Sequence, residues 1–113
     1  MKIELKPLSI NAAFCGRRFK TDAHKAYEQI LLLLLRGCKK HTGWYEIRFD
    51  FYLRSYKRSD LSNLIKVTED VLVKAGAVED DRFCKSMVIE KHPSKTDYFT
   101  FEIKEIKGGH NGK

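Results

Sequence analysis

Residues 44–56 read WYEIRFDFYLRSY, and this stretch decides the fold of the chain. Apolar and polar residues alternate along it, as they do in a strand whose two faces meet different surroundings. One face carries Tyr45, Ile47, Phe49, Phe51 and Leu53, and the other carries Trp44, Glu46, Arg48, Asp50 and Tyr52. The stretch therefore predicts a strand, the clearest one in the chain.

The segments on either side give the other elements of that sheet and the helices that cover it. We expect, in chain order, a strand at residues 2–8, a loop at 9–20, a helix from Thr21 to Gly37, a helix at 61–75 that ends at Gly76, and a hairpin of strands at 82–92 and 98–106. The order β-α-β-α-β-β predicts an α/β (α+β) fold, in which a small mixed sheet of about four strands carries two main helices. One domain is expected over residues 1–107, with a flexible tail at 108–113.

The first predicted helix has an unusual end. Its last two turns are apolar all round, with the run Ile30 to Leu35, so we expect burial on more than one side. A sheet on one side and a partner subunit on the other would achieve this. A central core helix in a monomer would achieve it equally well.

The second predicted helix, residues 61–75, separates into an apolar face and a polar stripe. The apolar residues fall within an arc of about 120° that should face the sheet; they are Leu61, Leu64, Ile65, Val71, Leu72 and Ala75. Asn63, Lys66 and Asp70 fall within about 60° on another side. Asp60 is expected to cap the helix, and Lys66 with Asp70 forms an i,i+4 pair, so these residues have a structural explanation. Asn63 has none, because a capping box places Glu or Gln three residues after the cap.

Asp80 and Asp81 follow the same helix after a short link. Because the chain turns from Gly76 directly into the next strand, this pair is able to return to the flank of the helix. Adjacent carboxylates repel each other unless a cation neutralises them, and converging carboxylates in a basic protein indicate a Mg²⁺ or Mn²⁺ site. Such an ion activates water against a phosphodiester, and a nearby lysine stabilises the developing charge.

The charge of the chain agrees with a polyanionic partner. Lys and Arg number 22 against 15 Asp and Glu, which gives a net charge of +7. A surface of this kind attracts nucleic acid. The three cysteines are widely spaced, and neither they nor the four histidines form a zinc motif, so we expect reduced thiols in a cytoplasmic protein. No stretch has the length of a membrane span or the apolar core of a signal peptide.

The acidic constellation resembles that of the RusA-type Holliday-junction resolvases of bacteria and their phages. The matching residues occur in the same order along the chain: Asp60-Leu61-Ser62-Asn63, Lys66, Asp70, Gly76 and Asp80-Asp81. The stretch GRRFKTDAHKAY at residues 16–27 is also similar, so the resemblance covers nearly the whole chain. It implies a RusA-like fold and a homodimeric, Mg²⁺-dependent endodeoxyribonuclease that nicks two opposing strands of a four-way DNA junction during recombination and repair.

The resemblance also implies roles for single residues. It assigns metal binding and catalysis to Asp60 and Asp81, with Asp80 and Asp70 in support. It makes Lys66 a catalytic cation and Asn63 an organiser of the site. The departure is Ser62, which stands where better-known members carry a second acidic residue.

Two basic clusters are candidates for DNA contacts. Arg17, Arg18 and Lys20 lie in the predicted first loop, and Arg54, Lys57 and Arg58 lead directly into Asp60. The second cluster is the better candidate for phosphate contacts, because it adjoins the predicted metal site. Paired cuts require two active sites related by a dyad, so a C2 dimer is expected, through the end of the first helix or the aromatic face of residues 45–53. The alternatives are a DNA-binding protein weakened in catalysis by Ser62, and a nuclease for other branched nucleic acids.

Overall fold

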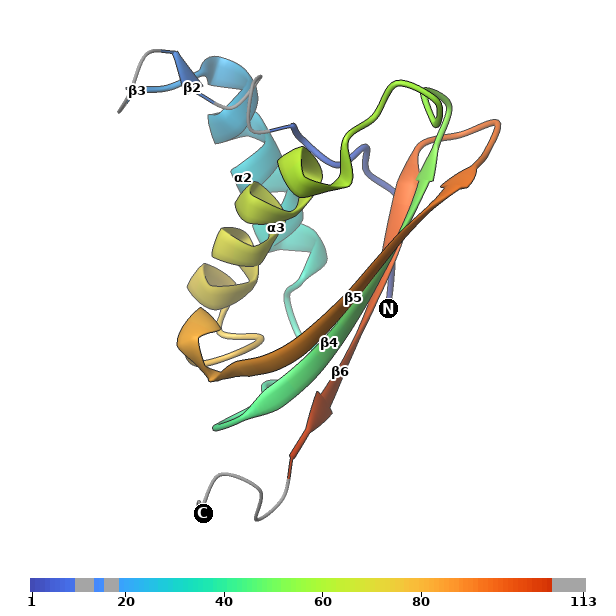
Figure 1. Ribbon diagram of the computed structural model, residues 1–113. Helices are drawn as coiled ribbons and strands as arrows, with labels where there is room; N and C mark the ends of the chain where they lie inside the picture. The colour runs from blue at the N-terminus through green and yellow to red at the C-terminus, as the bar shows by residue number, and fades with distance from the viewer. Residues whose placement is uncertain (10–13, 16–18, 107–113) are drawn as a thin grey trace.

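The computed structural model describes residues 1–9, 14–15 and 19–106, and its centre is a four-stranded mixed sheet with the order β1-β6-β4-β5 (Figure 1). The strands are β1 (Lys2–Ile3), β4 (Tyr45–Leu53), β5 (Cys84–Pro93) and β6 (Tyr98–Glu105). β4 runs parallel to β5 and antiparallel to β6, and β1 pairs antiparallel with β6. The expected mixed sheet is confirmed, with the strand of residues 45–53 between two long neighbours.

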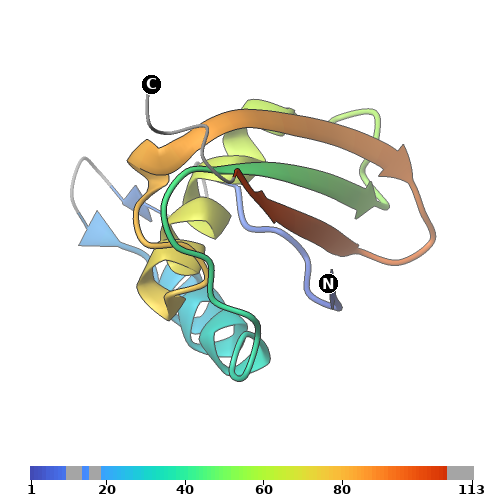
Figure 2. The ribbon, with the colours of Figure 1, turned by 90° about the horizontal axis from the view of Figure 1, so that it is seen from below.

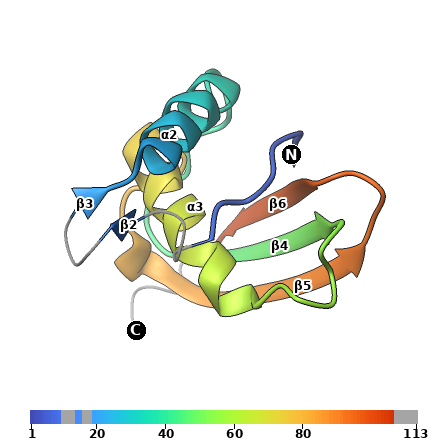
Figure 3. The same cartoon turned by 90° about the horizontal axis from the view of Figure 1, so that it is seen from above.

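Two helices, α2 (Asp22–Leu34) and α3 (Leu61–Ala75), lie together on one face of this sheet (Figures 1 and 2). α3 connects the parallel strands β4 and β5, which is the usual way to join such a pair. The odd-numbered residues of β4 point into the core beneath the helices, and Phe49 and Phe51 are fully buried there. Within the described residues, no helix or strand covers the opposite face (Figure 3).

The two helices are fastened to each other by polar contacts as well as by apolar packing. Tyr27 of α2 and Thr68 of α3 share a buried hydrogen bond of 2.7 Å between their hydroxyl oxygens. Burial raises the pKa of Tyr27 to about 12, although its hydrogen bonds with Thr68 and the Leu8 backbone act in the opposite direction. Glu28 of α2 also pairs with Lys74 of α3. These contacts join the middle of α2 to the middle and the last turn of α3.

Several boundaries differ from those expected. The first strand covers only Lys2–Ile3 instead of residues 2–8, because the chain turns at Leu5 and Pro7 offers no N–H to a ladder. The predicted loop 9–20 contains the short paired strands β2 (Phe14–Cys15) and β3 (Phe19–Lys20). β4 ends at Leu53 because residues 54–58 form a turn. A 3-10 turn, η1 (Asp81–Phe83), precedes β5, which therefore starts at Cys84 instead of residue 82.

The ends of the helices follow the expected chemistry. α3 covers the predicted residues 61–75 and stops at Gly76, whose φ of 80° is a left-handed cap that suits glycine. α2 starts after Thr21, which caps it, and its last residue is Leu34, three residues before Gly37. None of the described helices combines the length and apolar character needed to cross a bilayer. The predicted tail at 108–113 lies outside the described residues.

Two expectations about apolar surfaces need correction. The monomer does not bury the end of α2 on all sides: Ile30, Leu33 and Leu34 remain 45%, 61% and 42% exposed. The interpretation of α2 as a central core helix is therefore wrong. The aromatic face of β4 is the core itself, with Tyr45 and Phe49 almost inaccessible, so it is not a free surface for a partner.

Candidate functional site

Asp60 sits at the start of α3, in the role that its position predicts. Its Oδ1 accepts a hydrogen bond of 3.1 Å from the backbone N–H of Ser62, which makes Asp60 the N-cap. The Ser62 hydroxyl donates to the same oxygen over 2.8 Å. The serine that replaces an expected carboxylate is therefore held against the acid. The other Asp60 oxygen, Oδ2, has no hydrogen-bond partner among the described residues.

Lys66 brings together two carboxylates from different elements. Its Nζ lies 3.1 Å from Oδ1 of Asp70, one turn along α3, and 3.9 Å from Oδ2 of Asp81 in η1. The Asp70 hydrogen bond raises the pKa of Lys66, and the charge of Asp81 adds to this effect. The link after Gly76 thus returns to the flank of α3, and it brings Asp81 to the polar stripe. All three side chains are partly exposed, so the group is open to a substrate.

Asp80 belongs to a different arrangement from Asp81. Its Oδ1 accepts from the backbone N–H of Arg82 over 2.9 Å, and its Oδ2 accepts from Arg82 Nε over 3.1 Å. The backbone hydrogen bond lowers the pKa of Asp80, with the Arg82 charge in support. Asp80 therefore caps η1 and fixes the turn that presents Asp81.

Glu69 is a member of this region that the sequence analysis missed. It lies on α3 between Lys66 and Asp70 in the chain, and it is half-buried. Burial raises the pKa of Glu69, the negative charge of Asp81 raises it further, and Lys66 opposes both effects. Glu69 also raises the pKa of the Cys84 thiol, second to burial, so its carboxyl group faces the start of β5. A carboxyl group that takes up a proton readily suits proton transfer.

Asn63 lines a cavity of about 550 Å³ at the start of α3. The cavity lies between the segment after β1, one side of α2 and the turn that leads into Asp60. Its lining includes Leu5, Pro7, Leu8, Ala23, Tyr27, Ile30, Arg58, Asp60, Asn63 and Leu64. The Asn63 side chain is half-buried and makes no hydrogen bond with the described residues. Asn63, which has no structural explanation in the sequence, thus lies at the wall of this cavity.

The basic residues of the two predicted clusters have different surroundings. Arg58 lines the cavity beside Asp60, and Arg54 and Lys57 are exposed in the same turn. Lys20 is 3.4 Å from Glu28, so part of its charge is already balanced. Arg17 and Arg18 lie outside the described residues. Of the two clusters, the one beside Asp60 is the one that the structure places next to a site candidate.

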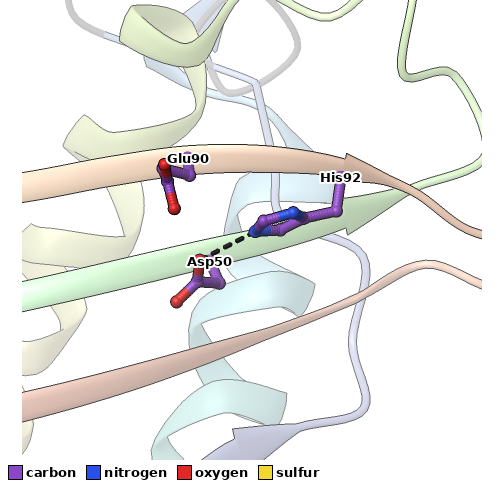
Figure 4. Close-up of side chains that lie close together, drawn as sticks. All are labelled: Asp50, Glu90 and His92. Carbon is purple, nitrogen blue, oxygen red and sulfur yellow. Dashed lines mark hydrogen bonds and ion pairs between the residues drawn. The ribbon is translucent and has the colours of Figure 1, made fainter.

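The described residues contain one group of three potential metal ligands whose ligating atoms all lie within 4.8 Å of one another, and it consists of Asp50, Glu90 and His92 (Figure 4). These side chains project from β4 and β5 on the face that the helices do not cover. Arg48 also contacts both carboxylates, with two hydrogen bonds of 2.9 and 3.0 Å to Asp50. These bonds to Arg48 lower the pKa of Asp50, and the 2.8 Å hydrogen bond from His92 has the same effect.

By their geometry, Asp50, Glu90 and His92 form a possible metal-binding site. Arg48 supplies the positive charge that a metal would supply, so the four residues form a closed ion-pair network. The predicted ligands Asp60, Asp70, Asp80 and Asp81 are not part of it. Instead, they lie along the α3 flank and η1, where Lys66 joins two of them.

A family model described as endodeoxyribonuclease RusA matches residues 16–104 of the chain. The chain belongs to the RusA family. The matched range contains α2, α3 and η1, and with them every acidic residue of the candidate site. Membership implies an endodeoxyribonuclease, an enzyme that cuts DNA within a strand. A comparison with curated proteins gave no match.

The side chains along the α3 flank offer the oxygen donors that a hard divalent cation prefers, but within the described residues Asp60, Asp70 and Asp81 do not form a group whose ligating atoms all lie within 4.8 Å of one another. Asp70, Asp81 and Asp60 supply carboxylate oxygens, which Mg²⁺ and Mn²⁺ prefer over nitrogen and sulfur. Lys66 lies between Asp70 and Asp81 and neutralises both in this structure. The donor set therefore has the right chemistry, with Lys66 as the cation that balances it.

Proposed function

We propose that this RusA-family protein is a metal-dependent, structure-selective endodeoxyribonuclease that resolves four-way DNA junctions by paired nicks. The observation that carries the proposal is the meeting of Lys66, Asp70 and Asp81 on the flank of α3, the helix that Asp60 caps. A basic chain of net charge +7 with carboxylates gathered around one lysine suits a site that binds both a cation and a phosphate.

Asp60 and Asp81 would hold the Mg²⁺ ion, with Asp70 and Asp80 in support. When bound, this ion supplies Lewis-acid stabilisation of the phosphodiester and a more acidic water. Release of Asp80 from Arg82 would be needed before Asp80 could contribute an oxygen. The Ser62 hydroxyl donates a hydrogen bond to Asp60 Oδ1, and this orients the Asp60 carboxylate while it leaves the second oxygen available.

Lys66 would place its positive charge beside the scissile phosphate. An ammonium group fixed by two carboxylates loses little freedom when the substrate binds, and it stabilises the negative charge that develops on the phosphorus oxygens. Glu69 is the residue best suited to exchange a proton with water, because burial and Asp81 both raise its pKa. Arg54, Lys57 and Arg58 would position the DNA backbone.

The exposed end of α2 supports a homodimer. Ile30, Leu33 and Leu34 form an apolar patch of the kind that monomers rarely leave uncovered, and we propose that the same patch of a second copy covers it. A dyad through this patch would relate two active sites, as two cuts in opposing strands require.

The test uses purified protein with three labelled substrates: a four-way DNA junction, a linear duplex of the same sequence, and an RNA hairpin. Each is incubated with and without Mg²⁺ or Mn²⁺. Nicks in opposing strands of the junction, only with metal, are the expected result. Tight junction binding without cleavage under any condition would favour a DNA-binding protein weakened by Ser62. Cleavage of the linear duplex or the RNA hairpin in place of the junction would mean that the substrate class is different.

A further inference from the structure

The cavity beside Asp60 has two kinds of wall. Leu5, Leu8 and Leu64 give it apolar sides, while Arg58, Asp60 and Asn63 stand along one edge. Its volume of about 550 Å³ lies within the range of about 300–1,000 Å³ that is typical of small-ligand sites. It differs in this respect from the shallow, charged surface around Lys66.

Hydrogen bonds within the protein hold two parts of the cavity lining. Tyr27 lines it and is fixed by the buried 2.7 Å hydrogen bond to Thr68. On the opposite side, Ser55 and Ser59 bond to each other, and the Arg58 and Ser59 backbone N–H groups bond to the Ser55 carbonyl. Because hydrogen bonds hold Tyr27 and the turn at residues 55–59, we expect these two parts of the lining to move little when a ligand enters.

The polar edge carries groups that remain available. Within the described part of the chain, the side-chain amide of Asn63 makes no hydrogen bond and the Arg58 guanidinium has no ion-pair partner. An asparagine amide both donates and accepts, and so does the edge of a nucleobase. An arginine beside it suits a phosphate oxygen.

We propose that this cavity receives one unstacked nucleobase from the branch point of the DNA, next to the strand that Asp60 helps to cut. The inference rests on the proposed function and adds the way in which a branch is recognised. The aliphatic walls enclose the two faces of the base, the Asn63 amide bonds to its edge, and Arg58 contacts the adjoining phosphate. Bases at a branch point lose part of their stacking, so taking one out of the helix costs less there than within a duplex.

The experiment places the fluorescent base 2-aminopurine, in turn, at each position that flanks the centre of a four-way junction. Its fluorescence rises when it leaves the stack. Protein is added without divalent metal, so that the DNA stays intact. The wild-type protein is expected to produce a rise at one pair of positions related by the junction symmetry.

Two variants fill the cavity from different walls, Ala23→Trp from α2 and Leu8→Trp from the N-terminal segment. Gln29→Trp is the matched control, since Gln29 is exposed on α2 and does not line the cavity. Both filling variants should remove the fluorescence rise and weaken junction binding by about tenfold, because the base then loses its contacts with the cavity walls. The control should keep both properties. Circular dichroism and light scattering check that folding and oligomeric state are unchanged.

The outcomes separate the inference from the proposed function. If the wild-type protein binds and nicks junctions but no position brightens, the inference is wrong and the proposed function stands. A rise that persists in both filling variants also overturns the inference, because the base then lies elsewhere. If the wild-type protein neither binds nor nicks junctions, the proposed function fails and the inference fails with it.

Discussion

Asp60 has an observed role as a helix cap and a proposed role as a metal ligand, and different substitutions separate the two roles. It caps α3 through Oδ1, and it is the first of the proposed metal ligands. Asparagine caps a helix about as well as aspartate but carries no charge, whereas alanine does neither. Asp60→Asn therefore removes the charge alone, and Asp60→Ala removes both the charge and the cap.

We expect Asp60→Asn to lower the cleavage rate by more than about 100-fold, since even the loss of an outer-shell partner of a metal costs about 10- to 100-fold. Its stability to urea should match that of the wild type. Asp60→Ala should be equally inactive and lose about 1 kcal/mol of unfolding free energy, the usual value of a cap. Normal cleavage by Asp60→Asn would remove Asp60 from the metal site.

Ser62 stands at the position where the resemblance led us to expect a second acidic residue. Ser62→Asp would add a carboxylate beside Asp60, and the repulsion between the two would favour a bound cation. We expect half-maximal cleavage at a lower Mg²⁺ concentration than in the wild type. Ser62→Ala is the control, which removes the 2.8 Å hydroxyl bond and adds no charge. A Ser62→Asp protein without any activity would show that the serine has a task of its own.

For single residues, the sequence predicted the contacts between residues that lie close together in the chain. The Asp60 cap and the Lys66–Asp70 pair follow from spacing along one helix, and both are confirmed. The approach of Asp81 to the flank of α3 was also predicted, because the link from Gly76 to Asp81 is short. Glu69 was missed because its raised pKa comes from burial and from Asp81, neither of which local spacing shows.

Among the elements, α2 and α3 are joined by an ion pair that responds to pH. Glu28 is almost buried and pairs with Lys74, and this hydrogen bond lowers the pKa of Glu28 despite the desolvation that acts against it. A lowered pKa in the folded state means that the carboxylate stabilises the fold at pH values above the ordinary value of 4.5. That contribution is lost as the pH falls through the lowered value.

We therefore expect Glu28→Gln to be less stable than the wild type at pH 7, and the difference in unfolding free energy to shrink below about pH 4. Urea denaturation at several pH values measures this difference. Glu4→Gln is the control, because Glu4 and Lys2 form an exposed pair that contributes little. A difference that stays constant down to pH 2 would show that the ion pair does not couple the helices.

The types and order of the long elements were predictable, but several of their ends were not. Periodicity sets α3 and the alternation of β4, which the sheet confirms. The short β1 depends on pairing with β6, almost a hundred residues away, and β2 and β3 depend on each other. Contacts of this kind are decided by tertiary structure, which a local pattern does not contain.

For the whole molecule, the exposed apolar residues predict which surface forms the interface between two copies. The aromatic face of β4 is used inside the monomer, which leaves the α2 patch of Ile30, Leu33 and Leu34 as the proposed interface. Leu33→Glu should give a monomer that remains folded, because Leu33 is 61% exposed and its loss leaves no cavity. Junction nicking should decrease in this variant because dimerisation is lost.

Analytical ultracentrifugation at several concentrations measures the dimer. Val88→Glu is the matched control, since Val88 is 48% exposed on the sheet face away from the helices. It should dimerise as the wild type does. If Leu33→Glu stays dimeric and Val88→Glu becomes monomeric, the open sheet face is the interface and the proposed one is wrong.

The most direct test of the central claim maps the nicks that the wild type and Asp81→Asn make in a four-way junction with Mg²⁺. Asp22→Asn is the control, an equal loss of charge at an exposed position of α2. We predict opposing nicks by the wild type and by Asp22→Asn. Asp81→Asn should give none, while it binds the junction as tightly or more tightly because a negative charge near phosphate is gone. Normal nicking by Asp81→Asn would contradict the account, because the metal and Lys66 would then not act at the α3 flank.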